Sequence, residues 1–541
     1  MAAGQGGALA RLRGRGLDIF QGTGGYGRRR GAGAGAKVLA AAVVLALLGA
    51  AGWVLFRRLN PDNAVPLLIL GRTVGPDDSL AAGAVPLGDG QFALRLADAV
   101  VTGPDGHTAT SGQDGRASLA FEAPAQLAVT APGYQDALFQ VDALPPDGPL
   151  GLQLEPRVLR GRVTDPRGSG VAEVAVQVGE QQAVTDDLGT FEVIAAVPGP
   201  VQARKVAWKA AEVAWDGSAE RFSLTLEPFI VRGVRVHGPV AGSAGQFADL
   251  MDMIDGTVIN ALLFDTKEEG GHVLYDSQVP GARSTGAMIN TYDAARVLAA
   301  AEERGLYTIT RIVTFQDPFW APANPDHAAR HTASGGVWTN SKGLAWADPT
   351  DRAAWEYPLA LAIEACQMGF DEIQFDYVRF PTDGDLSVIG YDVPVDQQVR
   401  VETIAAFLSE ARSRLHAEGC AVSADIFAIV LSVGDDQGIG QRVEELSASV
   451  DALSPMIYPS HYSRGWLGFD DPNAHPAEVV GQALDAGVPK MQGGMMRPWL
   501  QAFYYNAAQI AAQIAQAERH GAGWLLWNAT SDYQADWFPR E

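Results

Sequence analysis

Eight short apolar runs, separated by amphipathic segments, fill the C-terminal three-fifths of the chain and constrain its fold more than any other feature. The runs occupy residues 231–236, 258–264, 307–313, 372–375, 421–427, 452–457, 488–493 and 523–527. Helical patterns lie between them, for example at residues 294–305, 352–369 and 401–419, and each of these three ends in glycine, a common helix stop. Short buried strands that alternate with helices are typical of a parallel sheet. We therefore predict an α/β domain, a (β/α)₈ or TIM barrel, over residues 229–541.

The region between residues 59 and 228 has a different pattern, in which short alternating strands are interrupted by glycine, proline and aspartate. A weak internal repeat divides it, because residues 111–115 resemble residues 185–189 and a second pair of segments has nearly the same offset. We therefore predict two small β-sandwich modules, at residues 59–156 and 157–228. Neither contains a cluster of acids, histidines or cysteines. A spacer is the favoured role, and contact with the cell wall or its glycans is the alternative.

An uncharged apolar segment at residues 38–56 is long enough to cross a membrane as a helix. Basic residues are more numerous before this segment than after it, which places the N-terminus in the cytoplasm. We predict a disordered basic tail over residues 1–36, a transmembrane signal anchor over residues 37–58, and an extracytoplasmic remainder. A cleaved signal peptide is the alternative, because the small residues at 49–52 suit a peptidase.

The acidic composition and the cysteine count exclude several classes of function. A formal net charge of -23 argues against nucleic acid as a partner, because an acidic surface repels polyanions. One pair of cysteines, Cys366 and Cys420, cannot form a disulfide framework or a CxxC metal site, and buried free thiols are the favoured interpretation. The His327 and His331 pair lacks the glutamate of an HExxH metal site, and no phosphate-binding loop follows a strand. We therefore predict no cofactor and no metal.

Polar residues at the carboxyl ends of the predicted strands are the candidate site, because barrels of this kind build their chemistry there. The candidates are Asp265, Lys267, Arg311, Gln374, Asp376, Tyr377, Arg379, Asp425, Tyr458, His461, Trp527 and Asn528. Strand alternation places Glu372, Gln374 and Asp376 on one face of the fourth strand, and Ser423 and Asp425 on one face of the fifth. These polar faces must point inward, since helices cover the outside. Asp376 and Asp425 should therefore converge at one end of the barrel, although a lone aspartate at a strand end more often caps a helix.

The sequence GFDEIQFDYVRFPTDG at residues 369–384 resembles an uncharacterised bacterial family of glycoside hydrolases. The resemblance extends over most of the predicted barrel through residues 260–267, 310–318 and 335–349. It implies a sugar substrate and a distant similarity to α-amylase-type and other barrel glycosidases. Those enzymes carry a nucleophilic or basic aspartate where Asp376 stands, and an acid/base carboxylate, often glutamate, where Asp425 stands. The second β module resembles the carboxypeptidase regulatory-like sandwich, through G-x-V-x-D at residues 161–165 and T-D-x-x-G-x-F at residues 185–191.

These residues lead to a hypothesis of glycoside hydrolysis by two carboxyl groups, one ionised and one protonated. Asp376 is the expected ionised partner, because the charges of Arg379 and Arg311 would favour its anionic form. Asp425 is the expected acid, because apolar neighbours such as Phe427 and Tyr458 would raise its pKa.

Other candidates would contact the sugar rather than react with it. Asp265 and Lys267 would position sugar hydroxyls, and Trp338, Trp346 and Trp527 could stack on pyranose rings. Ordinary packing is the better expectation for any single one of these tryptophans.

Two other classes of function stay open at this point. A barrel that binds glycans or other envelope components without cleaving them is the main alternative, since a fold does not confer an activity. A metal-dependent deacetylase or hydrolase is a weaker one. The predicted substrate is an extracellular or cell-envelope polysaccharide, and the sugar, the linkage, the stereochemistry and the oligomeric state are left open.

Overall fold

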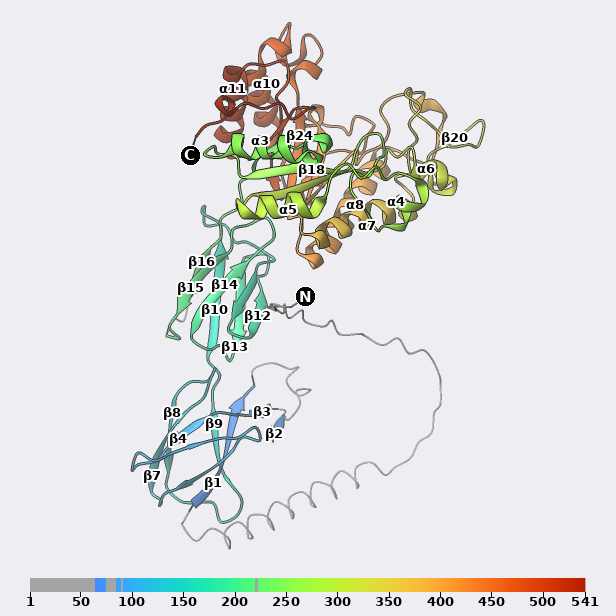
Figure 1. Cartoon of the computed structure of the whole chain (residues 1–541). Helices are drawn as coiled ribbons and strands as arrows, with labels where there is room; N and C mark the ends of the chain where they lie inside the picture. The colour runs from blue at the N-terminus through green and yellow to red at the C-terminus, as the bar shows by residue number, and fades with distance from the viewer. Residues whose placement is uncertain (1–63, 74–83, 89–90, 219–221, 541) are drawn as a thin grey trace, which may run out of the picture. The chain divides into compact units, whose positions relative to one another are not determined.

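The computed structural model describes residues 64–73, 84–88, 91–218 and 222–540 of the chain (Figure 1). The predicted cytoplasmic tail, residues 1–36, and the predicted signal anchor, residues 37–58, lie outside the described residues. Within the described part, no helix combines the length and the apolar character that a membrane span requires.

The first of two compact units contains the described residues up to Val158 together with Ile194–Val197, and it consists of two β-sheets. One sheet has the order β2-β3-β1-β6 with β9 beside β1, and its strands are β1 (Ala64–Arg72), β2 (Val85–Gly88), β3 (Gln91–Arg95), β6 (Arg116–Ala120) and β9 (Leu150–Leu154). The other has the order β5-β4-β7-β8, with strands β4 (Val100–Thr102), β5 (Thr108–Thr110), β7 (Ala125–Thr130) and β8 (Ala137–Val141). Side chains from both sheets, among them Leu67 and Leu127, form one buried core.

The second unit contains Leu159–Val193 and the described residues from Pro198 onward, and it begins with another pair of sheets. Their orders are β13-β10-β16 and β12-β11-β14-β15. The strands are β10 (Val158–Thr164), β11 (Ala175–Val178), β12 (Gln181–Val184), β13 (Thr190–Ile194), β14 (Gly199–Arg204), β15 (Ala211–Trp215) and β16 (Phe222–Thr225). The predicted likeness of this module to a carboxypeptidase regulatory-like sandwich stays a prediction.

The internal repeat corresponds to equivalent contacts in the two modules. The Ser111 hydroxyl accepts a hydrogen bond from the Ala99 N–H at 3.0 Å and donates one to a backbone carbonyl. Thr185 makes the same pair of bonds, accepting from the Val174 N–H at 2.9 Å. Both hydroxyl residues are buried. Each hydroxyl therefore links two backbone segments by hydrogen bonds. Without these bonds the buried polar groups would destabilise the core.

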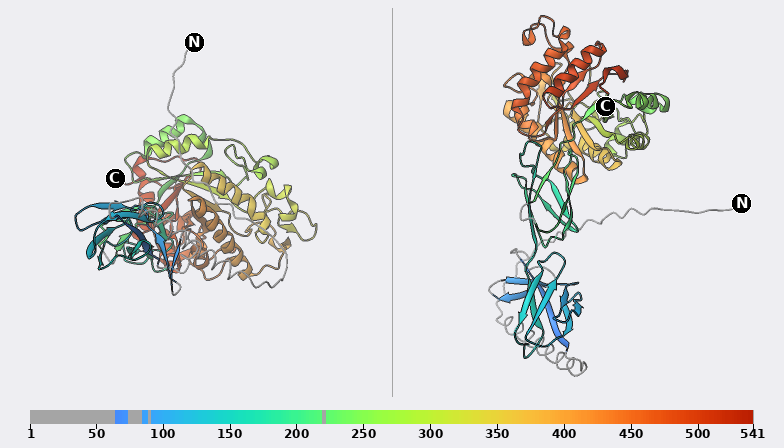
Figure 2. Two further views of the ribbon diagram at one scale, coloured as in Figure 1. Left: turned by 90° about the horizontal axis from the view of Figure 1, so that it is seen from below. Right: turned by 90° about the vertical axis from the view of Figure 1, so that its left-hand side faces the viewer.

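Eight parallel strands close into the predicted barrel, with helices around the outside (Figure 2). The strands are β17 (Arg232–Arg235), β18 (Ala261–Lys267), β19 (Tyr307–Val313), β21 (Glu372–Asp376), β23 (Ala421–Phe427), β24 (Ala452–Ile457), the divided seventh strand β25 (Met495–Met496) and β26 (Trp499–Gln501), and β27 (Trp524–Trp527). The ring closes where β17 pairs with β27. The α/β barrel predicted from the alternating pattern is confirmed.

The main helices between these strands are α3 (Ala244–Ile254), α5 (Ala294–Glu303), α7 (Arg352–Met368), α8 (Gln397–Glu418), α10 (Pro476–Gly487) and α11 (Ala507–Arg519). Shorter helices are α2 (Gly238–Gly242), α4 (Pro280–Thr285), α6 (Trp320–Ala323) and α9 (Val443–Ser447). On β21, Phe375 faces outward and packs against Phe407 of α8, with ring centroids 5.1 Å apart. This contact leaves Glu372, Gln374 and Asp376 on the inner face, as the alternation predicts.

The predicted seventh strand is wrong. Residues 488–490 form a short 3₁₀ helix after α10, and the strand that pairs with β24 lies later, in β25 and β26. The apolar run that suggested a strand contains Pro489, which cannot donate a hydrogen bond to a neighbouring strand.

The predicted free thiols are also wrong, because Cys366 and Cys420 form a disulfide with their Cα atoms 5.9 Å apart. Cys366 lies in the last turn of α7, and Cys420 immediately precedes β23. The glycines that end α7 and α8, Gly369 and Gly419, both have a positive φ and turn the chain back toward the start of the next strand. The two cysteines are therefore brought to the same end of the barrel.

Candidate active site

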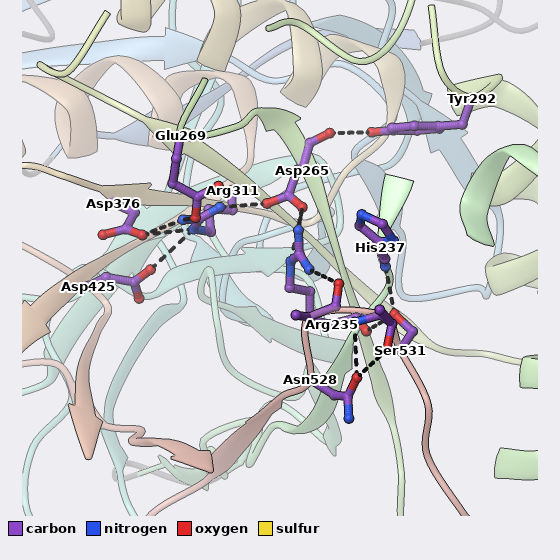
Figure 3. Close-up of polar contacts among 12 residues, drawn as sticks. Arg235, His237, Asp265, Glu269, Tyr292, Arg311, Asp376, Asp425, Asn528 and Ser531 are labelled. Carbon is purple, nitrogen blue, oxygen red and sulfur yellow. Dashed lines mark hydrogen bonds and ion pairs between the residues drawn. The ribbon is translucent and has the colours of Figure 1, made fainter. Parts of the chain in front are cut away.

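Arg311 of β19 is the centre of a charged cluster inside the carboxyl end of the barrel (Figure 3). Its Nη1 donates a hydrogen bond to Asp265 Oδ1 at 2.8 Å. Its Nε and Nη2 both donate to Asp376 Oδ2, at 2.9 and 2.6 Å, and Nη2 also contacts Glu269. Three acids therefore share the guanidinium group of Arg311, whose side chain is only 1% exposed. We call Asp265, Glu269, Arg311, Asp376 and Asp425 the carboxyl-end cluster.

Asp425 of β23 is the fourth acid of this cluster, and its environment differs from that of Asp376. Its Oδ2 lies 3.8 Å from Arg311 Nε, and its Oδ1 accepts a hydrogen bond from Trp499 Nε1 at 2.7 Å. Burial and the negative charge of Asp376 raise the pKa of Asp425 well above its usual value, although Arg311 and the Trp499 bond oppose them. The neutral, proton-bearing acid is thus favoured at Asp425.

Glu269 follows β18 and has the opposite protonation preference. Partial burial would favour the neutral acid, but the charge and hydrogen bond of Arg311 outweigh that effect and lower the pKa of Glu269 to about 2. The site therefore holds an ionised glutamate beside Arg311 and a protonated aspartate close to it.

A second arginine lies on the far side of Asp265 and completes the support of the cluster. Arg235 donates to Asp265 Oδ2 from Nε at 3.0 Å and from Nη2 at 2.6 Å. The Trp527 ring contacts both arginines, 4.3 Å from Arg235 and 5.1 Å from Arg311. Asp265 is completely buried. Its position indicates that it holds the two arginines in place and is covered by them.

A cavity of about 540 Å³ opens above this cluster. Eight predicted site residues line it, namely Arg311, Asp376, Tyr377, Arg379, Asp425, Tyr458, His461 and Trp527. Burial raises the pKa of Tyr377 to about 12 and lowers that of His461, so both side chains are neutral near pH 7. The structure thus brings both candidate catalytic aspartates to one cavity.

Four other predicted site residues lie away from the cavity wall: Asp265, Lys267, Gln374 and Asn528. Gln374 is buried lower in the barrel and donates a hydrogen bond to Ser454 at 3.2 Å. Asn528 holds its own loop, donating to Ala502 and accepting from the Thr530 N–H.

Lys267 is directed elsewhere by an irregularity in β18. The pairing with β19 shifts between Asp265 and Lys267, which removes the simple alternation that would have put both on one face. Lys267 is completely buried and binds Asp317 at 2.6 Å. Its role is therefore to pair with an acid in the surrounding structure.

The predicted stacking tryptophans divide in the same way. Trp527 lines the cavity, whereas Trp338 is buried and donates a hydrogen bond to the Asp385 carbonyl at 3.1 Å. Trp346 is completely buried, and its ring lies 5.1 Å from the Arg379 guanidinium. Packing, the expectation for any single tryptophan, describes Trp338 and Trp346.

Sequence reasoning missed several residues of the cavity wall, among them Glu269, Trp466 and Trp499. Glu269 could have been found, because it follows the second strand directly in the run Lys-Glu-Glu-Gly. Trp499 was hidden because the seventh strand was predicted too early in the chain. Trp466 lies in the 3₁₀ helix Trp466–Gly468, and no periodic pattern marks it.

Histidines, cysteines and acids could also have indicated a metal centre. In the part of the chain that the structure describes, they form no group of three or more that could hold a metal ion.

Comparisons with known proteins give a family for the barrel. Residues 233–533 match a family model described as "Putative glycosyl hydrolase domain". A search of curated proteins finds no match.

Several solved structures also align with the chain. A hypothetical protein from Ruminiclostridium thermocellum ATCC 27405 is 33% identical, over 36% of this chain and 96% of its own, with a TM-score of 0.33. A class V chitinase from Pseudomonas fluorescens Pf-5 is 14% identical, over 57% of this chain and 97% of its own, with a TM-score of 0.38. An alpha-galactosidase from Thermus thermophilus is 11% identical, over 75% of this chain and 72% of its own, with a TM-score of 0.37.

Proposed function

Because the chain belongs to the family described as "Putative glycosyl hydrolase domain", whose model matches residues 233–533, we propose that it hydrolyses glycosidic bonds in the cavity above the carboxyl-end cluster. The pair formed by Asp376 and Asp425 carries this proposal. Asp376 accepts two charge-assisted hydrogen bonds from the Arg311 guanidinium, as a carboxylate does, whereas burial and the charge of Asp376 raise the pKa of Asp425 and favour its protonated form. Glycoside hydrolysis requires one carboxyl group in each of these forms.

In the proposed reaction, Asp425 donates its proton to the glycosidic oxygen as the bond breaks. Asp376 acts on the other side of the bond, either by attacking the anomeric carbon to form a glycosyl ester that water then hydrolyses, or by accepting a proton from the water molecule that attacks this carbon. Both carboxyl groups approach the same atom, Arg311 Nε, at 2.9 and 3.8 Å, so a single sugar could contact both. Trp527, which is partly exposed, lines the cavity beside them and offers an aromatic surface for a pyranose ring.

We also propose that the barrel acts outside the cytoplasm, held by the anchor predicted at residues 37–58, on an extracellular or cell-envelope polysaccharide. The Cys366–Cys420 disulfide supports this location, since disulfides persist mainly in oxidising compartments. Thiol alkylation of the protein, taken directly from cells into denaturant so that both buried cysteines are accessible, tests it. The expected result is that neither cysteine is alkylated until a reductant is added, and quantitative alkylation without reductant would contradict the proposal.

One observation favours a second candidate, a barrel that binds glycans without cleaving them. Both oxygens of Asp376 already accept hydrogen bonds, Oδ2 from Arg311 and Oδ1 from the Tyr377 N–H at 2.6 Å. Asp376 is also only 4% exposed. A carboxylate satisfied in this way is stable without any role in turnover.

Release of reducing ends from a panel of cell-wall and secreted polysaccharides, measured with the full chain in detergent, separates the two candidates. Hydrolysis by the native protein should fall by about 10³-fold or more in Asp376→Asn and Asp425→Asn, the range lost with an essential acid or base. Asp249→Asn, on the exposed face of α3, is the matched control and should keep full activity. Saturable polysaccharide binding with no release of reducing ends would instead establish the binding protein.

A further inference from the structure

Arg379 is a buried cation at the wall of the proposed active site, and none of the described residues forms an ion pair with it. Only 6% of the residue is exposed, yet it lines the cavity. Its Nη1 donates hydrogen bonds to the Phe380 carbonyl at 3.0 Å and to Thr382 Oγ1 at 3.2 Å, and both acceptors are neutral. Burial lowers the pKa of Arg379, and the negative charges of Asp376 and Asp383 oppose this effect. Neither acid forms a salt bridge with Arg379, because Asp376 pairs with Arg311 and Asp383 contacts Asn340.

The other buried arginines of the described residues show that this arrangement is unusual for the molecule. Arg235, Arg311 and Arg497 are 4%, 1% and 3% exposed. Each has a carboxylate within 3.0 Å, which offsets the cost of removing a charge from water. Arg379 is buried to a similar degree and has no such partner.

Aromatic rings hold the Arg379 guanidinium in place without using its hydrogen-bond donors. Its carbon lies 4.6 Å from the centre of the Phe427 ring, 4.8 Å from that of Tyr377 and 5.1 Å from that of Trp346. These contacts offset part of its charge. Its Nε and Nη2 make no hydrogen bond to the described residues. Neither atom is fully buried, so both are in contact with solvent. These donors are accordingly available to a ligand in the cavity.

We propose that the sugar bound in this cavity is acidic and that its carboxylate pairs with Nε and Nη2 of Arg379. The inference rests on the proposed function, because it names the substrate class of the same site. A planar guanidinium matches a carboxylate with two parallel hydrogen bonds, and the rings keep its plane fixed. The carboxylate of the bound sugar also supplies the negatively charged partner that Arg379 does not have among the described residues. An acidic sugar should therefore bind more tightly than its neutral counterpart.

Binding of matched sugars to the full chain, followed by calorimetry or ligand-observed NMR, tests the proposal. The probes are glucuronate against glucose, galacturonate against galactose, and N-acetylmuramate against N-acetylglucosamine, with glucose 6-phosphate as the phosphate arm. We expect at least one carboxylate to bind about 10- to 100-fold more tightly than its neutral counterpart, the range of a charge-assisted hydrogen bond. The proposal is overturned if no pair differs, or if only the phosphate binds more tightly.

Variants of Arg379 connect the preference to this side chain. Arg379→Gln should remove the difference between acidic and neutral sugars, because it should weaken binding of the acidic sugar much more than binding of its neutral counterpart. Arg379→Lys, which keeps the charge without the planar fork, should retain part of the preference. Arg283→Gln, an exposed arginine of α4, is the control. An equal loss of affinity for both sugars in a folded Arg379→Gln protein would show that Arg379 only supports the cavity wall. If that variant does not fold, the comparison of acidic and neutral sugars with the native protein decides whether the proposal holds.

This measurement needs no turnover, so its failure and the failure of the proposed hydrolysis are distinguishable. Preferential binding of acidic sugars without release of reducing ends would refute hydrolysis and support the assignment of Arg379. Hydrolysis that depends on Asp376 and Asp425, with equal affinity for acidic and neutral sugars, would refute only the inference on Arg379.

Discussion

Two clusters of buried charge lie inside the same barrel, one at each end of β21. Asp376 ends this strand and belongs to the carboxyl-end cluster, whereas Glu372 begins it. Glu372 is bound by Arg497, through Nη1 at 3.0 Å and also through Nη2, and it accepts further hydrogen bonds from Ser423 and from Tyr307 at 3.2 Å. We call these four residues, Glu372, Ser423, Arg497 and Tyr307, the amino-end cluster.

The difference between the clusters lies in charge balance and in access. At the amino end one acid meets one arginine, and none of the four residues lines the cavity. At the carboxyl end four carboxyl groups meet Arg311 and Arg235, and the excess of acids beside a cavity helps to raise the pKa of Asp425. An arginine–carboxylate pair in a barrel is therefore no sign of catalysis by itself. An excess of acids over arginines at the end of the barrel that opens to a cavity is a better indicator of a catalytic site.

The largest expected effect separates the two clusters by activity. If the proposed hydrolysis is correct, Asp425→Asn should lower kcat/KM for the cleaved polysaccharide by about 10³-fold or more, because the proposed proton donor is lost. Glu372→Gln should keep kcat/KM within a factor of about 3 in the fraction that is folded, because Glu372 lies away from the cavity. Initial rates of reducing-end release, normalised to folded protein, give both values. Comparable losses in the two variants would remove the distinction between the clusters.

Stability should show the reverse order. Glu372→Gln leaves the Arg497 charge buried with no carboxylate partner, which costs about 3–5 kcal/mol of unfolding free energy. Asp376→Asn should cost only about 1 kcal/mol, because Arg311 keeps Asp265 and Glu269. Urea unfolding followed by tryptophan fluorescence measures both differences for the barrel transition. A larger loss in Asp376→Asn than in Glu372→Gln would contradict the assignment of the amino-end cluster to stability.

The strand pattern predicted the barrel and the faces of β21 and β23 because simple physical signals act on them. Helices on the outside require apolar residues on one face, so the polar residues of β21 had to point inward and carry Asp376 to the cavity. The same count on β23 placed Asp425 beside it. The limits of β19, β23 and β24 match the predicted ones, since a helix stop or a polar turn bounds each apolar run.

The parts that could not be predicted depend on irregular backbone or on contacts distant in sequence. The irregularity in β18 separates Lys267 from Asp265, and strand alternation cannot reveal it. The seventh strand is divided at Arg497 and Pro498, so its two short pieces give a weak signal. The disulfide joins cysteines 54 residues apart, and only the closed barrel shows that Cys366 and Cys420 meet.

That disulfide gives the next prediction, with a somewhat smaller effect. It ties the end of α7 to the start of β23, at the same end of the barrel as Glu372. Cys366→Ser with Cys420→Ser should cost about 2–4 kcal/mol of unfolding free energy, as expected for a loop of this length. The kcat/KM of the folded double variant should equal that of the native protein. A native protein whose unfolding does not respond to reductant would show that this covalent tie contributes nothing to stability.

The pH dependence tests the protonation state assigned to the carboxyl-end cluster. Because the pKa of Asp425 in the folded protein is raised, kcat/KM should be high below that pKa and fall as the pH rises through it. The same group gives the folded state a proton that the unfolded state has released. Its contribution to stability is therefore complete below the unfolded value of about 3.9 and is lost as the pH rises through the folded pKa. Unfolding free energies of the native protein and Asp425→Asn across this range should converge only at low pH.

The smallest expected effect tests the hydrogen bond that tunes this acid. Trp499 Nε1 donates to Asp425 Oδ1 at 2.7 Å and favours the ionised form, so Trp499→Phe should raise the pKa of Asp425 further. The basic limb of the kcat/KM profile should then move to higher pH. Trp527→Phe is the matched control, because it removes an indole from the same cavity without removing a hydrogen bond to Asp425. If the basic limb does not move in Trp499→Phe, or moves equally in both variants, a group other than Asp425 controls it. Asp425 would then lose its assignment as the proton donor.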